Sequence, residues 1–172
     1  MILKRFFRKS PSPERSLYEA IVAGARHPLP YARWGVADTI DGRFDMISLH
    51  MFLVLDRLKG EDEQFRQRLV DEFFADMDRS LRELGVGDIS VGKKVRKMAE
   101  AFYGRVAAYE AGLADGEAAL TAAVARNFFP EGDGGKAAAK LAVYVLAARA
   151  KLAEGRVDQL LAGEMDFPEP QP

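Results

Sequence analysis

The sequence predicts an all-α fold, a single compact multi-helix bundle with a mostly buried central helix. Apolar residues recur every three or four positions through most of residues 14–154, which is the period of a helix. The sequence contains no alternation of apolar and polar residues of the kind that strands require. Residues 44–58 are apolar on nearly all sides, so we expect this segment at the centre of the bundle.

The length of 172 residues fits one domain, which can bury a core without help from disulfides or metals. We expect a helical domain over residues 14–162. A basic tail precedes it at residues 1–13, and a proline-rich tail follows at 163–172. Both tails are predicted to be flexible, the first as a basic chain terminus and the second because of its proline-rich composition.

Turn and cap residues place the helix ends. Ser12-Pro13 indicates a first helix from about Glu14, and a short second helix is expected to end near Trp34. Residues 38–42 are predicted to form a turn in which Asp41 caps the central helix. Gly85 is expected to end a helix. Further helices are expected at about 61–84, 91–112, 115–127 and 136–153.

Composition excludes several kinds of site. The chain has no cysteine, so disulfides, thiolate zinc sites and cysteine nucleophiles are excluded. The net charge of −1 gives no general attraction to nucleic acid, and no DNA partner is expected. The charge is nevertheless uneven, because residues 1–35 carry +5 and residues 61–83 carry −4. Such asymmetry indicates a docking surface.

Motifs for catalysis or for a cofactor are missing from the sequence. The glycines at 85 and 87 lack the third glycine and the preceding strand of a dinucleotide fingerprint. Asp38, Asp41 and Asp45 are spaced three and four apart, which does not fit a calcium loop. No spacing supports a catalytic triad. We therefore expect no enzymatic activity, no catalytic residue, no metal and no cofactor.

The two histidines leave one alternative open. His50 lies in the most apolar helix, where a lone histidine is most often a hydrogen-bonded core residue. The alternative is a haem ligand, but nothing in the sequence places His27 opposite His50. A haem- or lipid-handling carrier therefore remains a second hypothesis for the function.

Two long segments of the sequence carry a resemblance to known proteins. The first comprises residues 38–45 and 49–55. The second comprises residues 77–88 and continues through 91–95 to 101–105 and Tyr109. Together they resemble signatures of the ubiquinol–cytochrome c chaperone family, and the resemblance covers roughly residues 17–155. It implies an all-helical, non-catalytic assembly factor for the respiratory cytochrome bc complex.

Known properties of this family suggest partners. Its mitochondrial members work with newly made cytochrome b, near the ribosome and with a small partner subunit. This chain has no recognisable mitochondrial targeting extension, so it looks more like a bacterial member. The resemblance implies cytochrome b as the client, meaning the new protein that the chaperone binds. The resemblance also suggests a ribosome or a small assembly factor as a further partner.

Candidate client-binding residues lie in the two family-like segments, near the 38–45 turn and along the 77–105 helix pair. We expect them to border a groove with apolar walls and a basic rim. They are Asp38, Asp41, Arg43, Asp45, Arg79, Arg82, Asp88, Lys93, Lys94, Lys97, Tyr103 and Arg105.

The N-terminal tail is a candidate membrane contact, because it combines cations with two aromatic residues. Its candidate residues are Lys4, Arg5, Phe6, Phe7, Arg8 and Lys9. The longest apolar run, residues 51–55, is far short of a membrane span. We therefore expect a cytoplasmic protein with a possible peripheral contact on the cytoplasmic face of the inner membrane. A third hypothesis is a ribosome- or RNA-binding module that uses residues 3–9 and 93–97.

Overall fold

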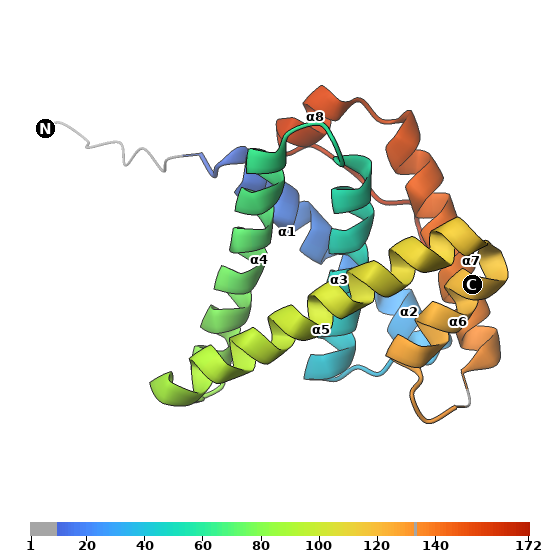
Figure 1. Cartoon of the computed structure of the whole chain (residues 1–172), viewed down its shortest axis with the longest axis horizontal. Coiled ribbons are helices and arrows are strands. Elements are labelled where there is room, and N and C mark those ends of the chain that lie inside the picture. Colours follow the sequence, from blue (N-terminus) through green and yellow to red (C-terminus); the bar gives the residue numbers. More distant parts are fainter. Residues whose placement is uncertain (1–9, 133) are drawn as a thin grey trace, which may run out of the picture.

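In the computed structural model, helices follow one another along the chain and pack into one bundle (Figure 1). The structure describes residues 10–132 and 134–172, and the candidate membrane-binding residues 4–9 lie outside them. No strand occurs in the described ranges, and the all-α prediction is confirmed. The helices are α1 (Pro13–Ala25), α2 (Pro28–Arg33), α3 (Ile40–Arg57), α4 (Glu63–Glu83), α5 (Asp88–Asp115), α6 (Glu117–Phe128), α7 (Gly135–Glu154) and α8 (Val157–Leu161).

Side-chain caps start several helices near the predicted positions. The Ser12 hydroxyl accepts a hydrogen bond from the Arg15 amide at 3.2 Å, at the start of α1. Gly85 has a φ of +81°, a conformation that other residues rarely adopt, and it follows the end of α4 as predicted.

The start of α3 differs from the prediction. The cap is Thr39, whose hydroxyl accepts a hydrogen bond from the Gly42 amide at 3.1 Å. Asp41 therefore lies inside the first turn of α3, where its charge is favourable to the helix dipole. The predicted turn at 38–42 is wrong in its second half. The short helix α8 was also not predicted, because five residues are too few to show a helical period.

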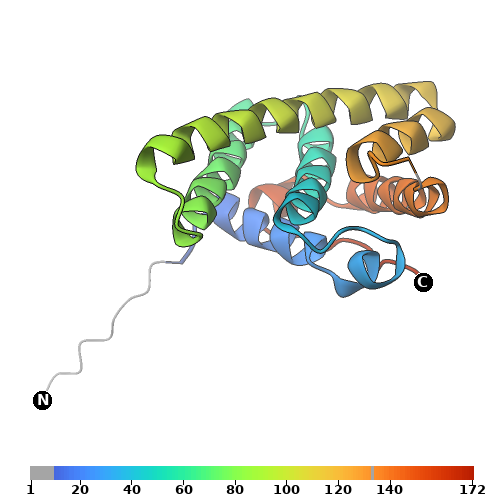
Figure 2. The same ribbon diagram turned by 90° about the horizontal axis from the view of Figure 1, so that it is seen from below.

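The helices form layers that Figure 2 shows from the side. The long helix α5 lies along one face of the bundle, and α1 and α2 lie on the opposite face. Between these faces run α4, α3 and α7. α3 packs against α1, α5, α6 and α7, so it is covered from several directions. This arrangement puts the predicted central helix at the centre of the bundle.

The middle of α3 is buried on all sides. Every side chain from Phe44 to Leu55 is buried, including the polar side chains of Asp45, Ser48 and His50. Such a helix needs apolar partners on all sides, and a buried polar group in it is most stable when it is bonded inside the protein. The positions of the neighbouring helices follow from this requirement.

His50 meets the requirement with two hydrogen bonds. Its Nδ1 lies 2.8 Å from the Met46 carbonyl oxygen, and its Nε2 lies 2.8 Å from the Tyr144 hydroxyl. The carbonyl can only accept, so Nδ1 carries the proton and Tyr144 donates to Nε2. Burial lowers the pKa of His50 to about 4. His50 is thus a neutral residue that joins α3 to α7.

The C-terminal segment lies against the bundle, in contrast to the predicted flexible tail. The Phe167 ring packs edge-on against the His50 ring, with centroids 4.5 Å apart. The Trp34 indole N–H donates a hydrogen bond to the Gln171 carbonyl at 3.2 Å, and Pro170 is buried. The composition of 163–172 suggested no packing partner, because the surface that receives Phe167 exists only once α1 and α3 come together.

We predict that Phe52→Ala destabilises the protein by about 3–5 kcal/mol. Phe52 is only 1% exposed, and its ring centroid lies 5.4 Å from that of Tyr109, so truncation leaves a cavity in the centre of the core. Urea unfolding measures the change. Val143→Ala, at a position that is 57% exposed, is the control and should change stability by less than about 0.5 kcal/mol. A similar loss in both variants would contradict the assigned position of Phe52.

We also predict that acid destabilises the protein through His50. As the pH falls below the ordinary pKa of 6.5, the unfolded chain protonates His50 while the native state does not. Stability is therefore lost between pH 6.5 and 4, by roughly 3 kcal/mol in total. Asp45 has a raised pKa and acts in the opposite direction, so the measurement compares the wild type with His50→Gln. A stability difference between the two proteins that does not vary with pH would refute this prediction.

Candidate functional site

The structure divides the twelve candidate client-binding residues into three groups. Asp38, Asp41 and Arg43 lie at the start of α3. Asp45 and Arg105 form an internal ion pair between α3 and α5. The remaining residues lie on the hairpin that α4 and α5 make. They are Arg79, Arg82, Asp88, Lys93, Lys94, Lys97 and Tyr103.

Two residues of the first group, Asp38 and Arg43, border a hollow of about 600 Å³. Arg43 Nε donates to Asp38 Oδ1 at 2.8 Å across the start of α3, and this hydrogen bond lowers the pKa of the Asp38 carboxyl. Gly42 allows the turn, because a Cβ there would lie 1.9 Å from the Ala37 carbonyl oxygen. The hollow is lined by Arg26, Pro28, Tyr31, Ala32, Asp38 and Arg43.

The second group is structural. Arg105 Nη2 lies 2.6 Å from Asp45 Oδ1, and both side chains are mostly buried. The Arg105 guanidinium also lies 5.3 Å from the centre of the Phe44 ring. Burial raises the pKa of Asp45 to about 6, against the opposing effect of the Arg105 charge. In this structure the pair ties α5 to α3 instead of facing outward, because the pattern of α3 turns Asp45 into the core.

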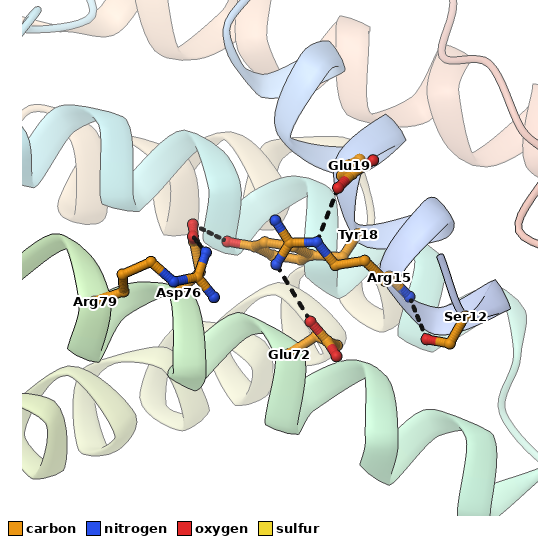
Figure 3. Close-up of polar contacts among 7 residues, drawn as sticks. All are labelled: Ser12, Arg15, Tyr18, Glu19, Glu72, Asp76 and Arg79. Atoms are coloured by element: carbon orange, nitrogen blue, oxygen red, sulfur yellow. Dashed lines mark hydrogen bonds and ion pairs between the residues drawn. The ribbon is translucent and has the colours of Figure 1, made fainter. Parts of the chain in front are cut away.

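The hairpin is braced against α1 by a polar network (Figure 3). The Tyr18 hydroxyl donates to Asp76 Oδ2 at 2.8 Å, and Arg79 Nη1 binds the other oxygen of Asp76 at 3.2 Å. One turn along α4, Arg15 Nη1 lies 3.3 Å from Glu72 Oε2. Arg79 is thus partly committed to a contact inside the protein.

The cations of the hairpin differ in how far they are neutralised. Arg82 binds Asp78 with Nε to Oδ2 at 2.6 Å and also binds Asp88 across the turn. In contrast, a second set forms no ion pair with any described residue, and all its side chains are exposed. This basic patch consists of Lys93, Lys94, Arg96 and Lys97. Three of them were predicted, and Arg96 belongs with them because it shares the outer face of α5.

Tyr103 lies farther along the outer face of α5 and is 53% exposed. It borders a small hollow of about 170 Å³ between α3, α4 and α5. Acidic side chains outnumber the single arginine there, so this hollow lacks the predicted basic rim. The charged lining residues are Asp56, Glu63, Arg66 and Glu110.

Sequence analysis missed two apolar side chains at the end of the hairpin. Leu84 is 59% exposed and Ile89 is 87% exposed. The helical spacing contained a signal, because Ile89 precedes Lys93 and Arg96 by four and seven residues and so shares their face. An apolar residue that shares a face with cations is not a core residue.

The described residues offer little support for a haem or metal site. Both nitrogens of His50 are bonded within the core, so neither is free for haem iron. His27 accepts a hydrogen bond from the Leu29 amide and contacts Glu169 at 3.0 Å, away from His50. Across 10–132 and 134–172 no group of three or more histidine or acidic side chains could hold a metal. No helix in these ranges is long and apolar enough to span a bilayer.

Comparison with known proteins identifies the fold and its relatives. The structure is similar to the crystal structure of the Cbp3 homologue from Brucella abortus, with a TM-score of 0.82 and 45% sequence identity. The match covers 91% of this chain and 89% of that one. The likeness therefore extends over most of the chain.

A curated relative and a family description agree with the structural match. The chain is 24% identical over 100 residues to ubiquinol-cytochrome-c reductase complex assembly factor 1 of Xenopus laevis. The match covers 56% of this chain and spans about half the length of that relative. A sequence model described as Ubiquinol-cytochrome C chaperone matches residues 32–167, which is most of the chain. This chain therefore belongs to the ubiquinol–cytochrome c chaperone family.

Proposed function

We propose that this protein is a non-catalytic chaperone that binds newly made cytochrome b and promotes assembly of the respiratory cytochrome bc complex. The observation that carries the proposal is membership of the family over residues 32–167. The relative from Xenopus laevis is named as an assembly factor of the same reductase complex. The chemistry of the chain agrees with binding rather than catalysis, because its buried titratable groups His50 and Asp45 serve the core.

The outer face of α5 is the proposed client surface. It presents the basic patch, and Tyr103 follows on the same side of the helix. Unpaired cations attract a partner from a distance, and an exposed tyrosine supplies apolar contact area. Gly104 next to Tyr103 has open space where a side chain would stand, which permits close approach by another chain.

The Asp45–Arg105 pair supports this surface indirectly. Arg105 lies two residues after Tyr103 and is held at 2.6 Å from a buried carboxylate of α3. A fixed rotation of α5 about its axis keeps Tyr103 and the basic patch facing outward. We assign Asp45 and Arg105 to positioning of the client surface. Asp38 and Arg43, which line the 600 Å³ hollow, together with Asp41 at the start of α3 would form a second contact.

Two further partners belong to the proposal. The basic N-terminal residues 4–9 would add a peripheral membrane contact on the cytoplasmic side. A ribosome or a small assembly factor would bring the chaperone to its client as it is made. These contacts are consistent with the surplus of positive charge in residues 1–35.

We predict that Lys93→Glu/Lys97→Glu leaves the fold intact and lowers the amount of assembled bc complex. Both side chains are exposed and without ion pairs to described residues, so their reversal costs little stability. Loss of steering should slow association with an anionic client surface by about tenfold or more at low ionic strength. Cytochrome b is quantified by its absorbance spectrum in membranes of cells that carry the variant.

The matched control is Lys136→Glu/Lys140→Glu. These lysines are also exposed and one turn apart, but they lie on α7. The control should retain normal cytochrome b. A photo-cross-linker at Tyr103, compared with one at Val143, tests direct contact with cytochrome b during synthesis. Normal cytochrome b in the α5 variant, at a normal level of folded protein, would exclude this face and favour the hollow at Asp38 and Arg43.

A further inference from the structure

The end of the α4–α5 hairpin has a composition that is unusual for an exposed turn. Its two large apolar side chains, Leu84 and Ile89, are 59% and 87% exposed. In both views the first turns of α5 project at the edge of the molecule, at the lower left of Figure 1 and the left of Figure 2. We call residues 84–89 the hairpin tip. Apolar side chains at a projecting tip have no core to cover there.

The cations of the basic patch follow the hairpin tip along α5. Ile89, Lys93, Arg96 and Lys97 share one face of α5. At the rise of an α-helix, Lys93 is about 6 Å and Lys97 about 12 Å from Ile89 along the axis. Apolar groups therefore lie outermost, and a belt of positive charge follows within two to three turns.

Nearby acids do not cancel this charge. Asp78 and Asp88 are both bound by Arg82, which also fixes the turn between the two helices. The four cations of the basic patch form no ion pair with the described residues. The charged residues of 78–97 are six cations and three acids, so the segment has a net charge of +3.

We propose that the hairpin tip is a docking site for an anionic phospholipid surface, with Leu84 and Ile89 inserted and the basic patch at the headgroups. Interfacial segments bury their apolar side chains about 5–10 Å into the headgroup boundary, and their cations bind the anionic lipids there. The 6–12 Å offset between Ile89 and the lysines matches that depth. The inference goes beyond the proposed function and does not require the client.

A bilayer fits this surface better than a folded protein does. The apolar side chains are at the convex end of a hairpin, whereas protein partners bury apolar anchors in pockets on both sides. The hollow beside Tyr103 is lined by α3, α4 and α5 farther along the hairpin and does not include Leu84 or Ile89. Contact at the tip also leaves Tyr103 accessible for a client that is itself in the membrane.

The test measures co-sedimentation of the full chain with protein-free vesicles of phosphatidylcholine, with and without phosphatidylglycerol. We expect binding only to the anionic vesicles, and Leu84→Ser/Ile89→Ser should weaken it roughly tenfold. Lys93→Glu/Lys97→Glu should weaken it at least as much at low salt. Val143→Ser is the control for loss of an exposed apolar side chain on another helix and should bind like the wild type.

A second measurement gives the depth of the tip. Ile89→Trp should be quenched by brominated lipids in anionic vesicles, while Val143→Trp should not. The native Trp34 is buried and gives a constant background. Phe6→Ser/Phe7→Ser in the intact chain separates the contribution of the N-terminal tail.

Three outcomes would overturn the proposal. The first is that the tip variant binds vesicles like the wild type, while the tail variant loses all binding. The second is that Ile89→Trp is not quenched. The third is that the tip variant lowers cytochrome b in cells without any change in vesicle binding, which would identify the tip as a protein contact. Because the vesicles contain no protein, failure of the proposed client role leaves these results unchanged.

Discussion

The burial of α3 is the constraint on which the rest of the structure depends. A helix that is buried from Phe44 to Leu55 must be covered from all directions, and α1, α5, α6 and α7 provide that cover. A polar group that stays unpaired inside the core lowers the stability of the fold, so burial favours bonds between the polar side chains of α3 and neighbouring residues. His50 is satisfied by Met46 and Tyr144, and the Asp45 carboxylate is paired with the Arg105 guanidinium. These contacts join the central helix to α5 and α7 in one arrangement.

The packing around α3 also distinguishes charged side chains that are paired within the protein from those that are free to bind another molecule. Arg43, Arg79, Arg82 and Arg105 each bind a carboxylate of this chain, whereas the cations of the basic patch bind none in the described ranges. The difference arises because the arginines lie where two elements meet, while the patch lies on the outer face of α5. Charges that are free of internal partners can interact with another molecule without first breaking a bond.

Membership of the ubiquinol–cytochrome c chaperone family is the basis for the proposed role of the outer face of α5. In the proposed function the client is a membrane protein, so the chaperone would meet it close to a bilayer. The hairpin places apolar side chains, cations and an exposed tyrosine in succession along one helix face. In our proposals the lipid contact at the tip and the client contact near Tyr103 are parts of a single orientation at the membrane.

The sequence by itself determined the helical class, most helix bounds and the central position of residues 44–58, because periodicity and caps are local properties. It also identified the free lysines of α5 as surface cations. The burial of Asp45 with Arg105 and the packing of Phe167 on His50 were decided only by the tertiary structure. Each depends on residues far apart in the chain, which local spacing does not bring together. Asp45 is a charged helix residue like Lys93, and only the packing of α5 over α3 buries it.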